Sequence, residues 1–168
     1  NPILHIIHFE SKYIISLWNR KEFFLKQVAK GYCGYYNRNR QNSLEGVSFM
    51  TVKERITALR EVMAEKKIDA YLVPTDDFHA SEYVGEYFKC RKYITGFTGS
   101  AGRAVIMQDM AGLWTDGRYF LQAADQLEGS TIQLFKMGEP EVPTVHQFLA
   151  DKLEKGMCLG FDGRTVSA

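Results

Sequence analysis

Cysteine is scarce in this sequence. The 168 residues include three cysteines, Cys33, Cys90 and Cys158, an odd number at wide spacings. This pattern excludes a disulfide framework and the close ligand pairs of a zinc site. It is typical of reduced thiols in an intracellular protein. We therefore expect a cytoplasmic protein.

Long hydrophobic runs and an excess of one charge are also missing. The apolar runs are much shorter than the roughly 20 residues that cross a bilayer, and no stretch has the charged, apolar and small-residue order of a signal peptide. The formal net charge is +1, from 21 basic and 20 acidic side chains. This balance gives no electrostatic reason to bind nucleic acid or an acidic membrane, and we expect neither partner.

The common catalytic and metal-binding motifs are absent as well. None of the four histidines stands in an H-E-x-x-H motif, and no serine lies in the G-x-S-x-G motif of a nucleophile elbow. The adjacent carboxylates Asp76 and Asp77 follow Pro74 and Thr75, a position typical of turn and cap residues. The sequence therefore predicts no metal, no cofactor and no catalytic residue within this chain.

A glycine-rich loop runs from Gly96 through Gly99 to Gly102. Its G-x-x-G-x-x-G spacing matches neither the Rossmann fingerprint nor the P-loop. Phosphate-binding loops lead into a helix whose amino end receives the anion, whereas a strand-like segment begins here at Arg103. The glycines instead predict positive φ angles and close approach of the backbone to its neighbours.

The sequence does contain an alternation of helical and strand patterns. Helical periodicity is found in residues 52–66, 118–127 and 144–153. Strand patterns are found in residues 70–73, 93–97, 103–108, 112–115, 131–135 and 157–161. Residues 109–111 separate two of these strands as in an antiparallel hairpin. The sequence thus predicts an α/β fold with a mixed sheet flanked by helices.

The sequence divides at Met50. Residues 1–49 hold seven basic side chains against three acidic ones and keep no sustained helical or strand period. Thr51 and Glu54 then form a capping box, a typical helix start. We expect residues 1–49 to be an extension, either upstream translated or disordered sequence, and residues 50–168 to be the folded domain. A genuine basic extension and residues added during cloning are the alternatives.

The most informative run extends from Trp114 to Ala124. Within it, Asp116, Gly117 and Arg118 lie between a strand-like and a helical segment. This places Arg118 at a strand-to-helix corner, where a side chain is held rigidly and points outward. Asp116 is expected to brace Arg118 or to cap the following helix. The alternative is an Asp–Arg pair that only fixes the corner.

Together with residues 71–77 and the glycine loop, this run resembles the N-terminal domain of aminopeptidase P, of the creatinase/prolidase family. The resemblance covers residues 52–162 and implies a ribonuclease H-like topology. In that family a C-terminal domain holds a pair of divalent metals, usually manganese, and removes the residue that precedes proline. The resemblance therefore implies an accessory domain of a Xaa-Pro metallo-aminopeptidase, whose metal site lies outside this sequence.

The resemblance also implies roles and partners. Arg118 matches an arginine that reaches the active-site mouth from a neighbouring domain or subunit and contacts substrate. The implied partners are the C-terminal catalytic domain of the same chain, further copies in a homo-oligomer, and a proline-containing peptide. The family's domain continues beyond Asp162, so we expect this one to be truncated at its C-terminal end. A free-standing, non-catalytic binding or scaffolding module of the same fold is the alternative.

Removal of residues 1–49 tests the division at Met50. The shortened chain is expected to keep its free energy of unfolding within about 1 kcal/mol, because an unpacked segment contributes little to stability. Chemical denaturation of both chains measures the difference. A large loss of stability would assign the nine aromatic residues of the segment to the core.

Overall fold

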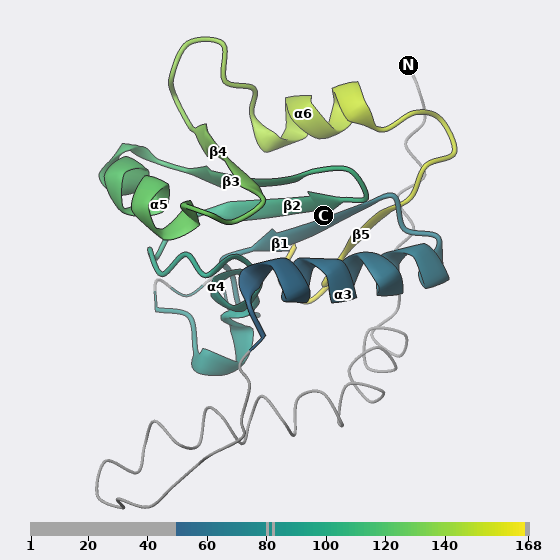
Figure 1. The fold of residues 1–168 in the computed structure, drawn as a ribbon, viewed down its shortest axis with the longest axis horizontal. Coiled ribbons are helices and arrows are strands. Elements are labelled where there is room, and N and C mark those ends of the chain that lie inside the picture. Colours follow the sequence, from purple (N-terminus) through teal and green to yellow (C-terminus); the bar gives the residue numbers. More distant parts are fainter. Residues whose placement is uncertain (1–49, 80, 82, 167–168) are drawn as a thin grey trace, which may run out of the picture.

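The structure is a computed structural model that describes residues 50–79, 81 and 83–166 (Figure 1). These residues form three layers, in which helices cover both faces of one sheet. The predicted extension, residues 1–49, lies outside the described residues. Among the described helices, none is both long and apolar enough to cross a membrane.

The sheet has five strands in the order β4-β3-β2-β1-β5. Their bounds are β1 Ala70–Pro74, β2 Arg103–Met107, β3 Ala111–Thr115, β4 Ile132–Lys136 and β5 Leu159–Phe161. β2 pairs antiparallel with β1 and β3, whereas the β1–β5 and β3–β4 pairs are parallel. The predicted mixed sheet is confirmed. Because β1, β3, β4 and β5 share one direction, their carboxyl ends lie at the same end of the sheet.

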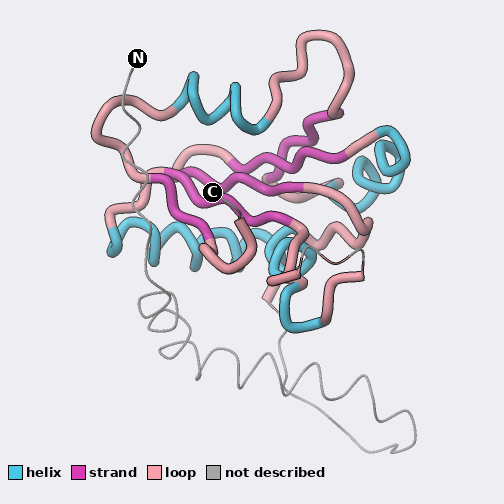
Figure 2. Tube along the Cα trace, turned by 180° about the vertical axis from the view of Figure 1, so that it is seen from behind, coloured by secondary structure: helices cyan, strands magenta, loops and turns pink. Residues whose placement is uncertain are grey.

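The helices divide between the two faces of the sheet. They are α3 Val52–Lys66, α4 Cys90–Thr95, α5 Phe120–Leu127 and α6 Val145–Lys152, with 3₁₀ turns η1 Glu86–Phe88 and η2 Gly117–Tyr119. Helix α3 runs along one face and α6 along the other, as seen from both sides (Figures 1 and 2). Buried residues of α4 and α5 belong to the same core cluster as those of α3.

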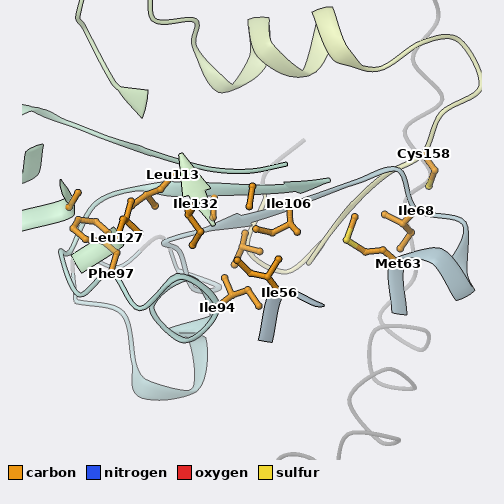
Figure 3. Close-up of a cluster of buried hydrophobic side chains, with 14 residues drawn as sticks. Ile56, Met63, Ile68, Ile94, Phe97, Ile106, Leu113, Leu127, Ile132 and Cys158 are labelled. Carbon is orange, nitrogen blue, oxygen red and sulfur yellow. The ribbon is translucent and has the colours of Figure 1, made fainter. Parts of the chain in front are cut away.

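The larger core lies between the sheet and helices α3, α4 and α5 (Figure 3). Ile56 and Met63 of α3 are 1% exposed, and Ile106 of β2 and Leu113 of β3 are fully buried. Burial of a side chain of this size stabilises the fold by about 1.5–3 kcal/mol. This cluster holds the glycine loop and the β3 corner on a rigid base.

A smaller core on the opposite face receives α6. Trp114 of β3 is fully buried, and its ring stacks on Phe135 of β4 with 4.0 Å between centroids. The indole also meets Phe148 of α6 edge-on at 5.0 Å. Its Nε1–H donates to the Pro143 carbonyl oxygen at 2.9 Å, which satisfies the one polar atom of the side chain.

The strand predicted for residues 93–97 is wrong. Residues 93–95 belong to helix α4, which ends at Gly96 with a left-handed φ of +76°. Arg91, Ile94 and Thr95 are the buried residues of α4, and their spacing of three and four is that of one helix face. The apolar run is too short for its periodicity to distinguish a helix from a strand.

The predicted starts of two helices are confirmed. At α3, Thr51 Oγ1 accepts from Glu54 N at 3.3 Å, and Glu54 Oε2 accepts from Thr51 N at 2.6 Å. Thr144 and Gln147 form the same capping box at the start of α6. The third predicted helix begins instead as the 3₁₀ turn η2 and becomes α-helical at Phe120.

Candidate functional site

Asp116 follows β3 at the carboxyl end of the sheet and begins the turn η2. Its Oδ1 accepts a hydrogen bond from Arg118 N at 3.1 Å, so the carboxylate caps the turn. The Arg118 side chain donates from Nε to Asp116 Oδ1 at 2.9 Å and from Nη2 to Oδ2 at 2.8 Å. The two predicted uses of Asp116, bracing and capping, therefore occur together.

This Asp116–Arg118 pair lies at the surface. The Arg118 side chain is 71% exposed and that of Asp116 is 35% exposed. The hydrogen bonds between the two side chains lower the pKa of Asp116 and raise that of Arg118. Solvent screens an ion pair in such a position, so it adds little stability. Its main effect is to fix the direction of the guanidinium.

Arg118 keeps donors for another molecule. A guanidinium carries five N–H groups, and Asp116 receives hydrogen bonds from two of them. Within the described part of the chain, Asp116 is the sole acceptor of hydrogen bonds from this side chain. One face of the guanidinium lies over the ring of Tyr119, with Cζ 5.3 Å from the ring centroid. The arrangement can bind a carbonyl or carboxylate that approaches from solvent.

The glycine loop lies beside this corner and is held by Arg91 of α4. Arg91 Nη1 donates to the Phe97 carbonyl oxygen at 2.9 Å, and Nη2 donates to that of Gly99. Arg91 Nε donates to the hydroxyl of Thr75, which follows β1. One side chain thus joins helix α4, the glycine loop and the end of β1.

Two threonine hydroxyls complete the attachment of the loop. Thr75 Oγ1 donates to the Gly102 carbonyl oxygen at 2.7 Å. Thr115 Oγ1, at the end of β3, donates to the Ala101 carbonyl oxygen at 2.8 Å. Together with the two bonds from Arg91, they give four loop carbonyls a side-chain donor. The loop is therefore held on both sides by neighbouring strand ends.

Arg91 is a buried cation, only 3% exposed. Burial lowers its pKa to about 10, so it stays charged at neutral pH. In the described residues no carboxylate lies within 4.0 Å of it. Carbonyl dipoles and the ring of Phe97, whose centroid is 4.8 Å from Arg91 Cζ, surround the charge instead.

The close approach predicted for the glycine loop occurs at Gly99. A Cβ on Gly99 would lie 2.3 Å from the tip of the Phe97 ring, a distance that no side chain tolerates. The positive φ predicted for the loop occurs at Gly96. The loop is therefore shaped by packing around Phe97, which is fully buried.

A second Asp-Gly-Arg corner follows β5. Asp162 Oδ1 accepts from Arg164 N at 3.0 Å and from Nε at 2.9 Å, and Oδ2 accepts from Nη2 at 2.6 Å. Here the arginine side chain is only 26% exposed, because it lies over the rings of Phe78 and Tyr87. This corner was not predicted from the sequence, although the repeated Asp-Gly-Arg tripeptide was a signal for it.

The described residues do not fit a pair of divalent metals. No group of three or more His, Cys, Asp or Glu side chains gathers among them. Asp77, one of the two adjacent carboxylates, accepts from His79 N at 2.9 Å and from Ser81 N at 3.1 Å. These backbone hydrogen bonds lower the pKa of Asp77, and the bond from Ser81 has the larger effect. It acts as a turn residue, as predicted.

Residues 55–168 match the family model of the creatinase/prolidase N-terminal domain. The chain belongs to this family. Aminopeptidase P2 of Arabidopsis thaliana is 47% identical over 121 residues, which are 71% of this chain and 17% of that protein. The match thus spans less than a fifth of the length of this curated relative.

Two solved structures share the fold. X-prolyl aminopeptidase of Caenorhabditis elegans, a cytosolic enzyme with a di-nuclear active site, is 39% identical with a TM-score of 0.64. The match covers 71% of this chain and 21% of that one. A creatinase/prolidase-like N-terminal domain from Corynebacterium diphtheriae is 29% identical with a TM-score of 0.50, over 70% of this chain and 80% of that one. The predicted fold class is confirmed.

Arg91 can be tested by the change Arg91→Met, which keeps much of its volume but removes every donor. We expect a loss of about 2–4 kcal/mol in the free energy of unfolding, because the carbonyls of Phe97 and Gly99 lose their donor. Removal of the buried charge offsets part of this loss. Chemical denaturation measures the loss.

The matched control is Arg103→Met, the same change at an exposed arginine at the start of β2. It is expected to alter stability by no more than about 0.5 kcal/mol. Equal effects of the two substitutions would contradict the role given to Arg91.

Proposed function

We propose that this chain is the N-terminal accessory domain of a Xaa-Pro metallo-aminopeptidase. The observation that carries the proposal is the 47% identity to aminopeptidase P2, within a match that covers only 17% of that protein. The 39% identity to an X-prolyl aminopeptidase with the same fold supports it. In this proposal the domain gates substrate and contacts other subunits.

The metal pair, in this proposal, lies in a C-terminal domain of the same polypeptide. The relative from Caenorhabditis elegans has a di-nuclear active site, and a bound pair of divalent ions, here manganese, supplies an activated water for hydrolysis of the peptide bond. The described residues of this chain gather no ligand set for such a pair. What they contribute is the binding and orientation of the peptide.

Arg118 is the residue that we propose for contact with the substrate, and Asp116 is its support. The Arg118 side chain is 71% exposed, held on one edge by Asp116, and still has unused N–H groups on the other. Because Asp116 compensates much of its charge, these donors suit a neutral peptide carbonyl as well as a carboxylate. In the proposal, Arg118 reaches the active-site mouth of a neighbouring domain or subunit.

The proposal places the protein in the cytoplasm as a homo-oligomer. The relative from Caenorhabditis elegans is a cytosolic enzyme, and a subunit contact brings Arg118 of one copy toward the catalytic domain of another. A free-standing, non-catalytic module of this fold is the alternative. The reading frame beyond Ala168 distinguishes them, since the accessory-domain proposal requires Asp, His and Glu metal ligands downstream.

The 168-residue chain alone is expected to be inactive. Purified chain incubated with manganese and a Xaa-Pro peptide should release no N-terminal residue, because the proposal places the metal site in another domain. The full-length protein serves as the positive control. If the purified chain cleaves the peptide and a chelator abolishes this activity, the placement of the metal site in another domain is wrong.

The substitution Arg118→Ala in the full-length protein tests the substrate contact. We expect kcat/KM for a Xaa-Pro peptide to fall by about tenfold to a hundredfold, the usual effect of losing a charge-assisted hydrogen bond. Arg118→Lys should recover only part of this loss, because an ammonium is a point charge without a planar pair of donors. The midpoint of thermal unfolding should stay within about 3 °C of the wild-type value.

Arg164→Ala is the matched control, since it removes the arginine of the second Asp-Gly-Arg corner. Arg164 covers Phe78 and Tyr87, so this change is expected to lower thermal stability more than Arg118→Ala and kcat/KM less. Unchanged kinetics of Arg118→Ala, or unfolding of that variant, would make Arg118 a structural corner residue.

A further inference from the structure

Arg118 and Arg91 are connected by two aromatic rings that contact each other edge-on. The buried Arg91 guanidinium lies 4.8 Å from the centroid of Phe97. The Phe97 ring meets that of Tyr119 edge-on, with 5.9 Å between centroids and an interplanar angle of 80°. The Tyr119 ring in turn lies under Arg118, 5.3 Å from its Cζ. This cation–ring–ring–cation column leads from the core to the exposed guanidinium.

A hydrogen bond between two hydroxyl groups fixes the outer ring of the column. Ser100 Oγ, in the glycine loop, lies 2.7 Å from Tyr119 OH. Ser100 is exposed, but its backbone belongs to the loop whose carbonyls at Gly99 and Ala101 accept bonds from Arg91 and Thr115. The rigid loop therefore holds the far end of the tyrosine.

We propose that Tyr119, anchored by Ser100, is a positioning residue for Arg118, an inference that rests on the proposed substrate contact of Arg118. A flexible arginine side chain loses conformational entropy when it binds, and prior orientation reduces this loss. Asp116 fixes one edge of the guanidinium, and Tyr119 supports one face. With an edge and a face both held, the remaining N–H groups point in one direction toward solvent.

The second corner shows that the Asp-Gly-Arg turn does not produce this arrangement by itself. Arg164 makes the same three hydrogen bonds to its aspartate as Arg118, and a fourth from Nε to Oδ2 at 3.2 Å. Its guanidinium, however, lies over Phe78 and Tyr87 and is largely covered. Among the described residues, the tie to the glycine loop through Tyr119 and Ser100 therefore occurs at the exposed arginine alone.

The test uses Ser100→Ala and Tyr119→Phe in the full-length protein. Each removes one hydroxyl and with it the hydrogen bond between Ser100 and Tyr119, and Tyr119→Phe keeps the ring under Arg118. Each is expected to lower kcat/KM for a Xaa-Pro peptide by about twofold to tenfold, the effect of one hydrogen bond. The double variant should lose no more than either single variant, because both changes break the same bond.

The same two changes in an Arg118→Ala background separate positioning from a general structural role. If Tyr119 acts through Arg118, neither change alters kcat/KM further once Arg118 is gone. Tyr87→Phe, which removes the hydroxyl that Arg164 contacts at 3.5 Å, is the control and should leave kcat/KM unchanged.

The outcomes distinguish this inference from the proposed function. If Arg118→Ala lowers kcat/KM but Ser100→Ala and Tyr119→Phe do not, the positioning role is wrong and the substrate contact stands. If Ser100→Ala or Tyr119→Phe lowers kcat/KM further when added to Arg118→Ala, the positioning role is also wrong. If Arg118→Ala itself has no effect, or the full-length protein does not cleave Xaa-Pro peptides, it is the proposed function that fails.

Discussion

The arrangement at the candidate site depends on one buried cation. Arg91 is 3% exposed and donates to two carbonyls of the glycine loop and to a threonine hydroxyl. A glycine-rich segment has more backbone freedom to lose than any other, so without such donors it has little reason to keep one shape. Because Arg91 fixes the loop against Phe97, Ser100 stays within hydrogen-bond distance of Tyr119.

The two arginines at the ends of the aromatic column are compensated in opposite ways. Among the described residues, Arg91 is surrounded by carbonyl dipoles and a ring but by no carboxylate. Arg118, at the surface, has a full carboxylate partner in Asp116. A buried cation without a counter-charge costs stability, whereas a solvated pair is nearly neutral in this respect. The hydrogen bonds from Arg91 to the loop carbonyls offset the cost of burying its charge, whereas Asp116 mainly orients Arg118.

Local patterns were enough to predict much of this fold, because their causes lie within a few residues. The capping box of Thr51 and Glu54 and the corner at Asp116 are short-range hydrogen bonds and could be read directly. The role of Arg91 could not be predicted from the sequence, because most arginines are surface residues. Its acceptors also lie in a loop that only tertiary packing brings close to it. The same limit explains the strand predicted for residues 93–97, where burial of one helix face decides the outcome.

Strand β5 makes the longest-range strand pairing in the sheet. It pairs parallel with β1, and near this pairing Cys158 N donates to Asp69 Oδ2 across a separation of 89 residues. The other strand pairs join elements that are neighbours along the chain. Because closing a long loop costs more chain entropy than closing a short one, the β1–β5 pairing costs more chain entropy than the pairings among β1 to β4. The corner that carries Arg118 therefore rests on pairings between strands that are consecutive in the chain, whereas the corner that carries Arg164 rests on the long-range β1–β5 pairing.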